Sequence, residues 1–212
     1  MSKTSTKPAT AASSKSSDKS EKTTRDSNGT NENITANPQA TGTHGVHAAS
    51  SLVPQMINTT EDMFVNDLRD MYWAELHLVK ALPKMAGAAS GTDLKAALEE
   101  HLDVTLIQVS RLEQVFELAG IPNIAKKCDA LEGLVISGEQ VIENTRTGSD
   151  MRDTGIIGSG LKVENFEITC YKGLIQLADK LGYTDAVELL TENLREEEEA
   201  SDTLNTLAAQ SN

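Results

Sequence analysis

Glu164, Glu167 and Tyr171 are spaced so that a helix would bring two carboxylates and a phenol onto one side. At about 100° per residue, Tyr171 falls roughly 20° from Glu164 around the helix, and Glu167 falls roughly 60° from it. A carboxylate inside an apolar stripe is unfavourable unless it is protonated, paired or bound to a metal ion. The segment therefore predicts partners from other helices, since its neighbours on that side are core-type residues: Ile157, Leu161, Ile168 and Ile175.

Three further segments repeat this arrangement, because each has an apolar helical stripe with a polar residue at its centre. Glu75 occupies the centre in the segment that begins near residue 60, His101 in the segment that begins at residue 92, and Glu197 in the segment 184–209. Glu167 adds a fifth polar residue at the edge of the stripe of the segment 151–181. A polar residue on every long helix indicates a shared site.

A two-metal centre inside a four-helix bundle requires carboxylates and imidazole, the residue types found here: Glu75, His101, Glu164, Glu167 and Glu197. Carboxylates bind hard ions and can bridge two of them, and imidazole suits iron, manganese or zinc. We therefore predict iron or manganese as the cofactor, with Tyr171 as a hydrogen-bond donor to a ligating carboxylate. The residues leave an alternative open, a metal-free polar layer of buried Glu–His and Glu–Tyr hydrogen bonds.

The depth of each residue along its helix indicates which of these side chains can meet. Glu164 lies 18 residues before the turn of its hairpin and Glu197 lies 15 after it, a mismatch of about 4–5 Å that lets the two share a site. Glu75 lies 16 residues before the other turn and His101 lies 10 after it, which puts them about 9 Å out of level. Thr105 would be level with Glu75, but it is a weak ligand.

The helices that must position these residues predict an all-α fold. The turn at Ser90–Thr92 closes one antiparallel hairpin, Gly182 closes a second, and an extra crossover helix at about 127–144 connects them. Residues 1–58 are rich in Ser, Thr, Asn and Lys with few large apolar side chains, which predicts a disordered tail. The predicted folded domain therefore spans residues 59–210, a bundle of four long helices.

Charge is divided unevenly along the chain of 212 residues, whose net charge is −13. Residues 1–60 hold six basic and four acidic side chains, so 13 basic and 28 acidic side chains fall in the remainder. A domain that acidic repels phosphate backbones, and we expect no nucleic-acid partner for it. No apolar run is long enough for a membrane span, and the two cysteines form no disulfide framework, so we expect a cytoplasmic protein without a membrane partner.

Several stretches of the predicted domain form a recognisable set. They are Asp67–Glu75 with Leu82–Met85, Leu98–His101 with Gln108–Phe116, Cys128–Gly133, Val163–Glu167 and Leu194–Glu197. Together they resemble the YciE/YciF family, a ferritin-like domain of unknown function, over about residues 60–209. The resemblance implies a ferritin-like four-helix bundle related to rubrerythrin, in a bacterial, stress-associated protein that forms a homodimer.

Glu164, Glu167 and Tyr171 also match the Glu-x-x-Glu and Glu-x₆-Tyr pattern of rubrerythrin. With this resemblance, the five candidate ligands imply a protein that binds iron or manganese and reacts with oxygen or peroxide. The sequence does not decide whether the chain is an enzyme, because a non-enzymatic, dimeric structural or stress protein with an incomplete or vestigial site fits the same residues.

One departure from ferritin-like metal proteins bears on this choice. Two helices of such proteins carry Glu-x-x-His, whereas here Val104 stands three residues after His101 and Ala200 stands three residues after Glu197. A single metal ion, an unusual pair of ions or a vestigial site are all compatible with this ligand set.

Overall fold

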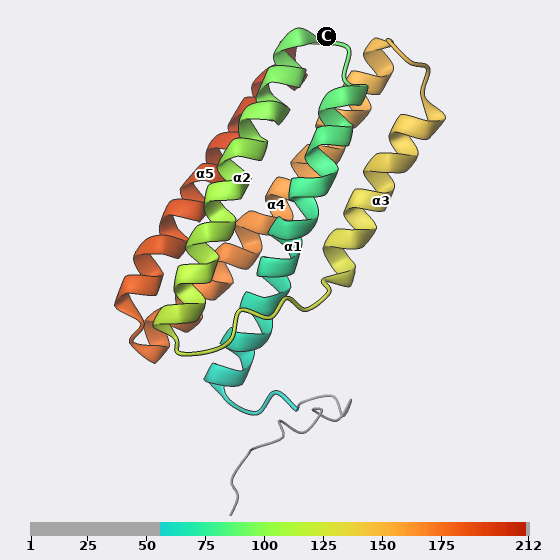
Figure 1. Cartoon of the computed structure of the whole chain (residues 1–212). Helices are drawn as coiled ribbons and strands as arrows, with labels where there is room; N and C mark the ends of the chain where they lie inside the picture. The colour runs from blue at the N-terminus through green and yellow to red at the C-terminus, as the bar shows by residue number, and fades with distance from the viewer. Residues whose placement is uncertain (1–55, 211–212) are drawn as a thin grey trace, which may run out of the picture. The chain divides into compact units, whose positions relative to one another are not determined.

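The computed structural model describes residues 56–210, a stretch that folds into five helices without a β-strand. The predicted all-α class is confirmed, whereas the predicted disorder of residues 1–58 falls almost wholly outside the described residues. The helices in Figure 1 are α1 (Thr60–Ala88), α2 (Thr92–Leu118), α3 (Asp129–Asn144), α4 (Asp150–Leu181) and α5 (Thr184–Gln210).

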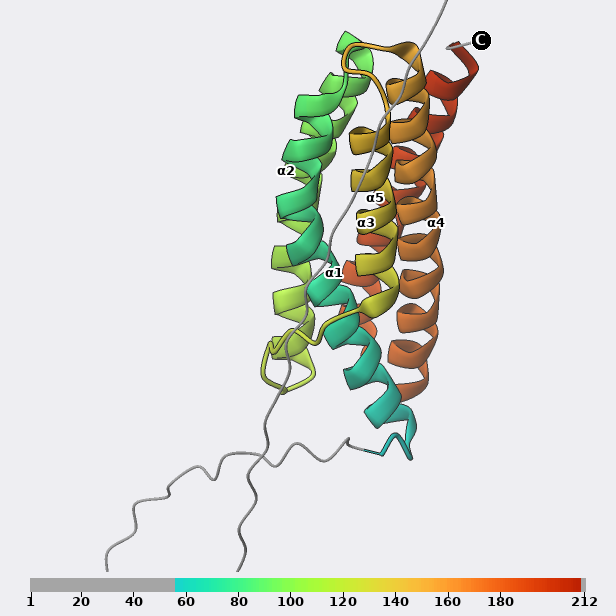
Figure 2. The same ribbon diagram turned by 90° about the vertical axis from the view of Figure 1, so that its right-hand side faces the viewer.

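Four long helices form a closed ring around the core of the bundle. The helix α1 contacts α2, α2 contacts α5, α5 contacts α4, and α4 contacts α1. The shorter α3 lies outside this ring against α1 and α4, as the two views in Figures 1 and 2 show. Side chains on the inner faces of α1, α2, α4 and α5 therefore point toward one another. None of the described helices combines the length and apolar character that a membrane span requires.

The connection between α2 and α3 crosses α1 and is hydrogen-bonded to it (Figure 1). The backbone N–H of Lys126 donates to the carbonyl of Arg69 at 3.1 Å. The Nζ of the same lysine donates to Asn66 Oδ1 at 2.7 Å and to Asp70 Oδ2 at 2.8 Å. These contacts hold the connection against α1, and the crossover helix begins at Asp129, two residues later than predicted.

The first two helices begin in different ways. Thr59 caps α1, and its side chain accepts a hydrogen bond from the backbone N–H of Asp62 in the first turn. Thr92 does not cap α2, because Gly91 is the N-cap and no side-chain hydrogen bond is made there. Instead Asp153 of α4 accepts hydrogen bonds from the backbone N–H of Ser90 at 2.8 Å and of Gly91 at 2.7 Å. The turn of the first hairpin is thus tied to the second hairpin.

The buried arc of α4 is shifted from the predicted stripe. The predicted core residues Leu161, Ile168 and Ile175 are only partly buried, whereas Glu167 has no exposed surface. Glu167 lies at the centre of the buried arc and not at its edge, because α4 is covered by α1, α3 and α5. The apolar stripes of α1 and α2 are buried along their length, namely Phe64, Leu68, Met71, Leu78 and Leu82, and Leu94, Leu98, Leu112, Val115 and Phe116.

Close packing of α3 on α4 depends on one glycine. A Cβ placed on Gly155 would lie 2.3 Å from Val141 Cγ1, whereas a Cβ on Gly158 meets nothing within 4 Å. Valine is stiff in a helix and does not move aside easily. We expect Gly155→Ala to lower the free energy of unfolding by about 1–3 kcal/mol through overpacking. Gly158→Ala, the matched control, should raise it by about 0.5–1 kcal/mol through helix propensity alone. Urea unfolding of both variants checks this, and equal effects would contradict it.

Candidate metal centre

Helix α4 supplies two carboxylates to the middle of the bundle. Glu164 is 3% exposed and Glu167 has no exposed surface. The helix is fixed at its start by Ser149, whose side chain accepts a hydrogen bond from Arg152 N, and at its end by Gly182. Gly182 adopts φ 77°, a left-handed conformation that glycine reaches without strain. The spacing of the two glutamates on one helical face, inferred from the sequence, is what brings both into the core.

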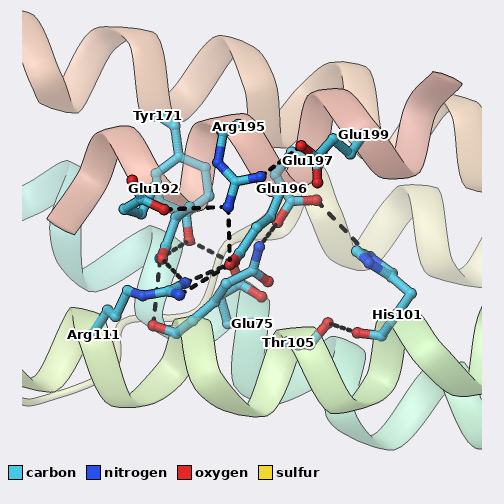
Figure 3. A network of polar contacts seen from close by, with 12 residues as sticks. Glu75, His101, Thr105, Arg111, Tyr171, Glu192, Arg195, Glu196, Glu197 and Glu199 are labelled. Carbon is cyan, nitrogen blue, oxygen red and sulfur yellow. Dashed lines mark hydrogen bonds and ion pairs between the residues drawn. The ribbon is translucent and has the colours of Figure 1, made fainter. Parts of the chain in front are cut away.

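The second and fifth helices add an imidazole and a third carboxylate. His101 Nε2 of α2 lies 3.5 Å from Glu164 Oε1 and 3.9 Å from Glu197 Oε2 of α5. One ligand atom from each of these residues and one from Glu167 all lie within 4.8 Å of one another. Figure 3 shows His101 and Glu197 facing each other from their two helices. Four of the five candidate ligands are therefore brought together.

Glu75, the fifth candidate, faces the same interior but is held by a phenol. It is 1% exposed, and its Oε1 accepts a hydrogen bond from the hydroxyl of Tyr171. Burial raises the pKa of Tyr171 well above its usual range, and the charges of Glu75 and Glu197 raise it further. The phenol therefore keeps its proton and remains a donor. This is the contact expected of Tyr171, made to the carboxylate on α1 (Figure 3).

Two amide side chains that were not among the predicted site residues complete the polar core. Gln108 Nε2 donates to Glu197 Oε1 at 2.6 Å, and Asn193 Nδ2 donates to the hydroxyl of Tyr171 at 3.0 Å. Both amides have no exposed surface. Periodicity could have found them, because Gln108 stands seven residues after His101 and Asn193 stands four before Glu197, each on the same helical face.

Arg111 anchors this polar core from its periphery. Its Nη1 donates to Asn193 Oδ1 at 3.0 Å, and the guanidinium forms two hydrogen bonds to the Glu196 carboxylate at 2.7 and 2.9 Å. A bidentate pair of this kind fixes both side chains. Thr105, which the depth estimate placed level with Glu75, instead donates to the carbonyl of His101 at 2.8 Å within its own helix.

Burial controls the protonation of the carboxyl cluster. It raises the pKa of Glu164 to about 7. Burial also raises the pKa values of Glu75, Glu167 and Glu197 well above the usual range, and the charges of neighbouring carboxylates raise them further. Four acids so close together cannot all be ionised at neutral pH unless a positive charge compensates them. A divalent cation would supply that charge.

Several oxygen atoms of the cluster lack a hydrogen-bond donor among the described residues. They are buried and comprise both carboxylate oxygens of Glu167 and the Oε2 atoms of Glu75, Glu164 and Glu197. Buried polar atoms are nearly always hydrogen-bonded, and each exception calls for a cause. Carboxylate oxygens that converge beside a histidine nitrogen form a donor set suited to iron, manganese or zinc. The residues present therefore fit a bound metal ion.

The chain is similar to a family of known proteins over most of its length. The family described as "Domain of unknown function (DUF892)" matches residues 59–212. Protein YciF of Escherichia coli strain K12 is 42% identical over 147 residues, which are 69% of this chain and 87% of that protein. The crystal structure of the E. coli stress protein YciF matches with a TM-score of 0.71 and 39% identity, covering 73% of this chain and 98% of the other. A putative structural protein from Rhodopseudomonas palustris matches with a TM-score of 0.70 and 37% identity over the same shares.

Proposed function

The chain belongs to the family described as domain of unknown function DUF892, and on that premise we propose that its bundle holds iron or manganese for redox chemistry with oxygen or peroxide. Membership confirms the resemblance to the YciE/YciF family that the sequence motifs indicated. One relative is described as a stress protein, and we extend that association to this chain as part of the proposal.

The observation that carries the proposal is the group of four ligand atoms within 4.8 Å of one another, from His101, Glu164, Glu167 and Glu197. A purely structural polar layer would pair its buried oxygens with donors, because an unpaired buried oxygen is unfavourable. Here both oxygens of Glu167 have no donor among the described residues. A bound cation would satisfy these oxygens and balance their charge at once.

The residues around the cluster have separate roles in this proposal. His101, Glu164, Glu167 and Glu197 would hold the ion, and iron or manganese held there would supply a redox centre for oxygen or peroxide chemistry. Gln108 fixes the orientation of Glu197 through the hydrogen bond to Oε1, leaving Oε2 for the ion.

Glu75 is the residue best placed to serve a second ion. Its Oε1 accepts the Tyr171 hydroxyl, while its buried Oε2 has no donor among residues 56–210. The negative charge of Glu197 also raises the pKa of the Glu75 carboxyl. A carboxylate that has one oxygen held by a protein donor and the other available is the usual arrangement around a metal ion. We assign Glu75 to the proposed site on this basis, with Tyr171 as its orienting donor.

A non-enzymatic role is the second candidate, because two positions depart from the usual ligand pattern. Val104 and Ala200 stand where Glu-x-x-His would place histidines, and one relative is described as a putative structural protein. In this alternative the bundle is a structural component of a stress response, and the buried acids hold protons in place of metal. A homodimer, which the family resemblance implies, is part of both candidates and remains a prediction.

Metal analysis of the full chain separates the two candidates. Protein purified without chelators or a histidine tag and supplied anaerobically with iron should retain about one or two ions per chain. Glu167→Gln should lose most of this iron, whereas Glu198→Gln, which changes a half-exposed neighbour of the cluster on α5, should keep it. Fewer than about 0.1 ions per wild-type chain would overturn the proposal. Retained iron without any consumption of peroxide or oxygen would leave only a structural metal.

A further inference from the structure

A solvent-accessible groove between α2 and α5 leads to the candidate metal centre. Its volume is about 190 Å³, and its lining includes two of the candidate ligands, His101 and Glu164. His101 is 9% exposed and Glu164 is 3% exposed, whereas Glu167 and Glu197 have no exposed surface. The groove therefore reaches the cluster on the side where its ligands are least covered.

Two residues that line this groove stand where two-metal bundles carry histidines. Val104 and Ala200 both line it, and they are the residues that stand three positions after His101 and Glu197. In two-metal bundles, Glu-x-x-His places imidazoles at this spacing, projecting toward the ions. Here the space beside the cluster is bordered by the side chain of Val104 and the methyl group of Ala200. Ala97, which lies on α2 and faces α5 across the groove, is a third small lining residue.

An unpartnered buried atom points to a ligand at the end of the groove. Glu164 lines the groove, and its Oε2 atom is buried without a hydrogen-bond donor among the described residues. His101 Nε2 lies 3.5 Å from the other oxygen of the same carboxylate. A molecule that enters the groove would thus meet the two groups that would hold an ion there.

The size and charge of the groove restrict what can enter. Pockets for drug-sized ligands have volumes of about 300–1,000 Å³, so a space of about 190 Å³ suits a molecule of a few non-hydrogen atoms. The lining also includes three carboxylates, Glu100, Glu196 and Glu199. Arg111 pairs with Glu196 and Arg195 pairs with Glu199, which offsets part of this negative charge. No lysine or arginine is itself among the lining residues. Such an entrance disfavours anions relative to neutral molecules.

We propose that this groove is the entrance by which a small neutral molecule, of the size of dioxygen or hydrogen peroxide, reaches the metal centre, and that Ala97 and Ala200 keep it open. The inference rests on the proposed function, because it assigns the access route of the same site and the preference of that route for neutral molecules. It adds that the reacting molecule approaches from the His101 and Glu164 side, between α2 and α5.

Nitric oxide is a suitable probe, because it is neutral, diatomic and gives a visible absorption change when it binds ferrous iron. Its association with the iron-loaded full chain is followed anaerobically by stopped-flow absorbance. Ala97→Leu and Ala200→Leu, on two different helices, should each slow association by about tenfold or more by filling the groove. Ala96→Leu is the matched control, because Ala96 is exposed on α2 and does not line the groove, and its rate should stay within about twofold of wild type.

The charge of the entrance is tested with azide as an anionic probe of similar size. Azide should associate more slowly than nitric oxide with the wild type, and Glu100→Gln combined with Glu199→Gln should raise the azide rate about tenfold without changing the rate for nitric oxide. An azide rate that these substitutions leave unchanged would overturn the assignment to neutral molecules.

Iron content measured on every variant distinguishes a failure of the entrance from a failure of the metal site. Iron bound in all variants with unchanged nitric oxide rates in Ala97→Leu and Ala200→Leu would overturn the entrance and leave the proposed function standing. No iron in the wild type would overturn both. If the leucine variants do not fold, Ala97→Val and Ala200→Val should show the same slowing, reduced to about threefold by the smaller side chain.

Discussion

Without metal ions at about pH 8, Glu197→Gln should be more stable than the wild type by about 1–3 kcal/mol. Glu197 has no exposed surface, and burial together with the charge of Glu164 raises its pKa well above the usual range. Glutamine removes the ionisable group, and its amide oxygen can still accept the hydrogen bond from Gln108 that Glu197 accepts at 2.6 Å. The substitution therefore relieves an unfavourable burial without opening a cavity.

Added Mn²⁺ should reverse this order of stability. An ion that binds only the folded state stabilises it by RT ln(1 + [L]/Kd), about 4 kcal/mol at a thousandfold excess over Kd. The wild type should gain this amount, and Glu197→Gln should gain little, because it has lost a charged ligand. Urea unfolding with EDTA and with Mn²⁺ measures both effects.

The matched control for this crossover is Glu198→Gln, on the same helix. The Glu198 carboxylate is half-exposed and pairs with Lys172 at 2.8 Å, so its loss should change stability by less than about 0.5 kcal/mol with or without metal. Equal stabilisation of the wild type and Glu197→Gln by Mn²⁺ would place the ion elsewhere, and an absence of any stabilisation would favour the metal-free polar layer.

The metal-free protein should lose stability as the pH rises from about 5 to 8, with Glu164 alone contributing on the order of 3 kcal/mol between its ordinary pKa and a pKa of about 7. Burial raises the pKa of this carboxyl in the folded state, so the folded protein binds more protons than the unfolded chain. The contribution is thus fully present below the unfolded pKa and is lost as the pH rises through the folded value. Glu75, Glu167 and Glu197, whose pKa values are also raised, extend the loss to higher pH.

Urea unfolding in EDTA across this pH range measures the effect, and Glu164→Gln should flatten the profile. Glu198→Gln should not, which separates the buried cluster from the general repulsion of an acidic surface. In the metal-loaded protein the trend should be opposite, because bound carboxylates are deprotonated and affinity rises with pH. A wild-type profile that is flat or rises in EDTA would show that the buried carboxyls do not hold protons in the metal-free state.

The sequence was sufficient to place the interior polar residues because helical periodicity is a local property. Glu75, His101 and Glu197 are each buried at the centre of an apolar stripe, as predicted from the 3.6-residue period. Counting residues from the turn at Gly182 also predicted that Glu164 and Glu197 lie at a similar depth in the bundle, and ligand atoms of both belong to the same 4.8 Å group. Whether these residues bind a metal remains a prediction.

Properties that depend on contacts between distant segments were not predictable from one helix at a time. Glu167 was placed at an edge because a single stripe was considered, whereas three helices cover α4 and bury it completely. The carboxylate of Asp153, 62 residues along the chain from Gly91, accepts hydrogen bonds from the turn before α2, a contact that the local sequence of that turn does not indicate. Contacts of this kind are set by the packing of one hairpin against the other.

The most direct measurement is a crystal structure of the protein grown with Mn²⁺, with anomalous scattering recorded for that element. The account predicts an anomalous peak in the middle of the bundle, within coordination distance of His101, Glu164, Glu167 and Glu197. No peak at this position in a well-ordered bundle, with the four side chains unmoved, would contradict the central claim that the buried acidic cluster is a metal site.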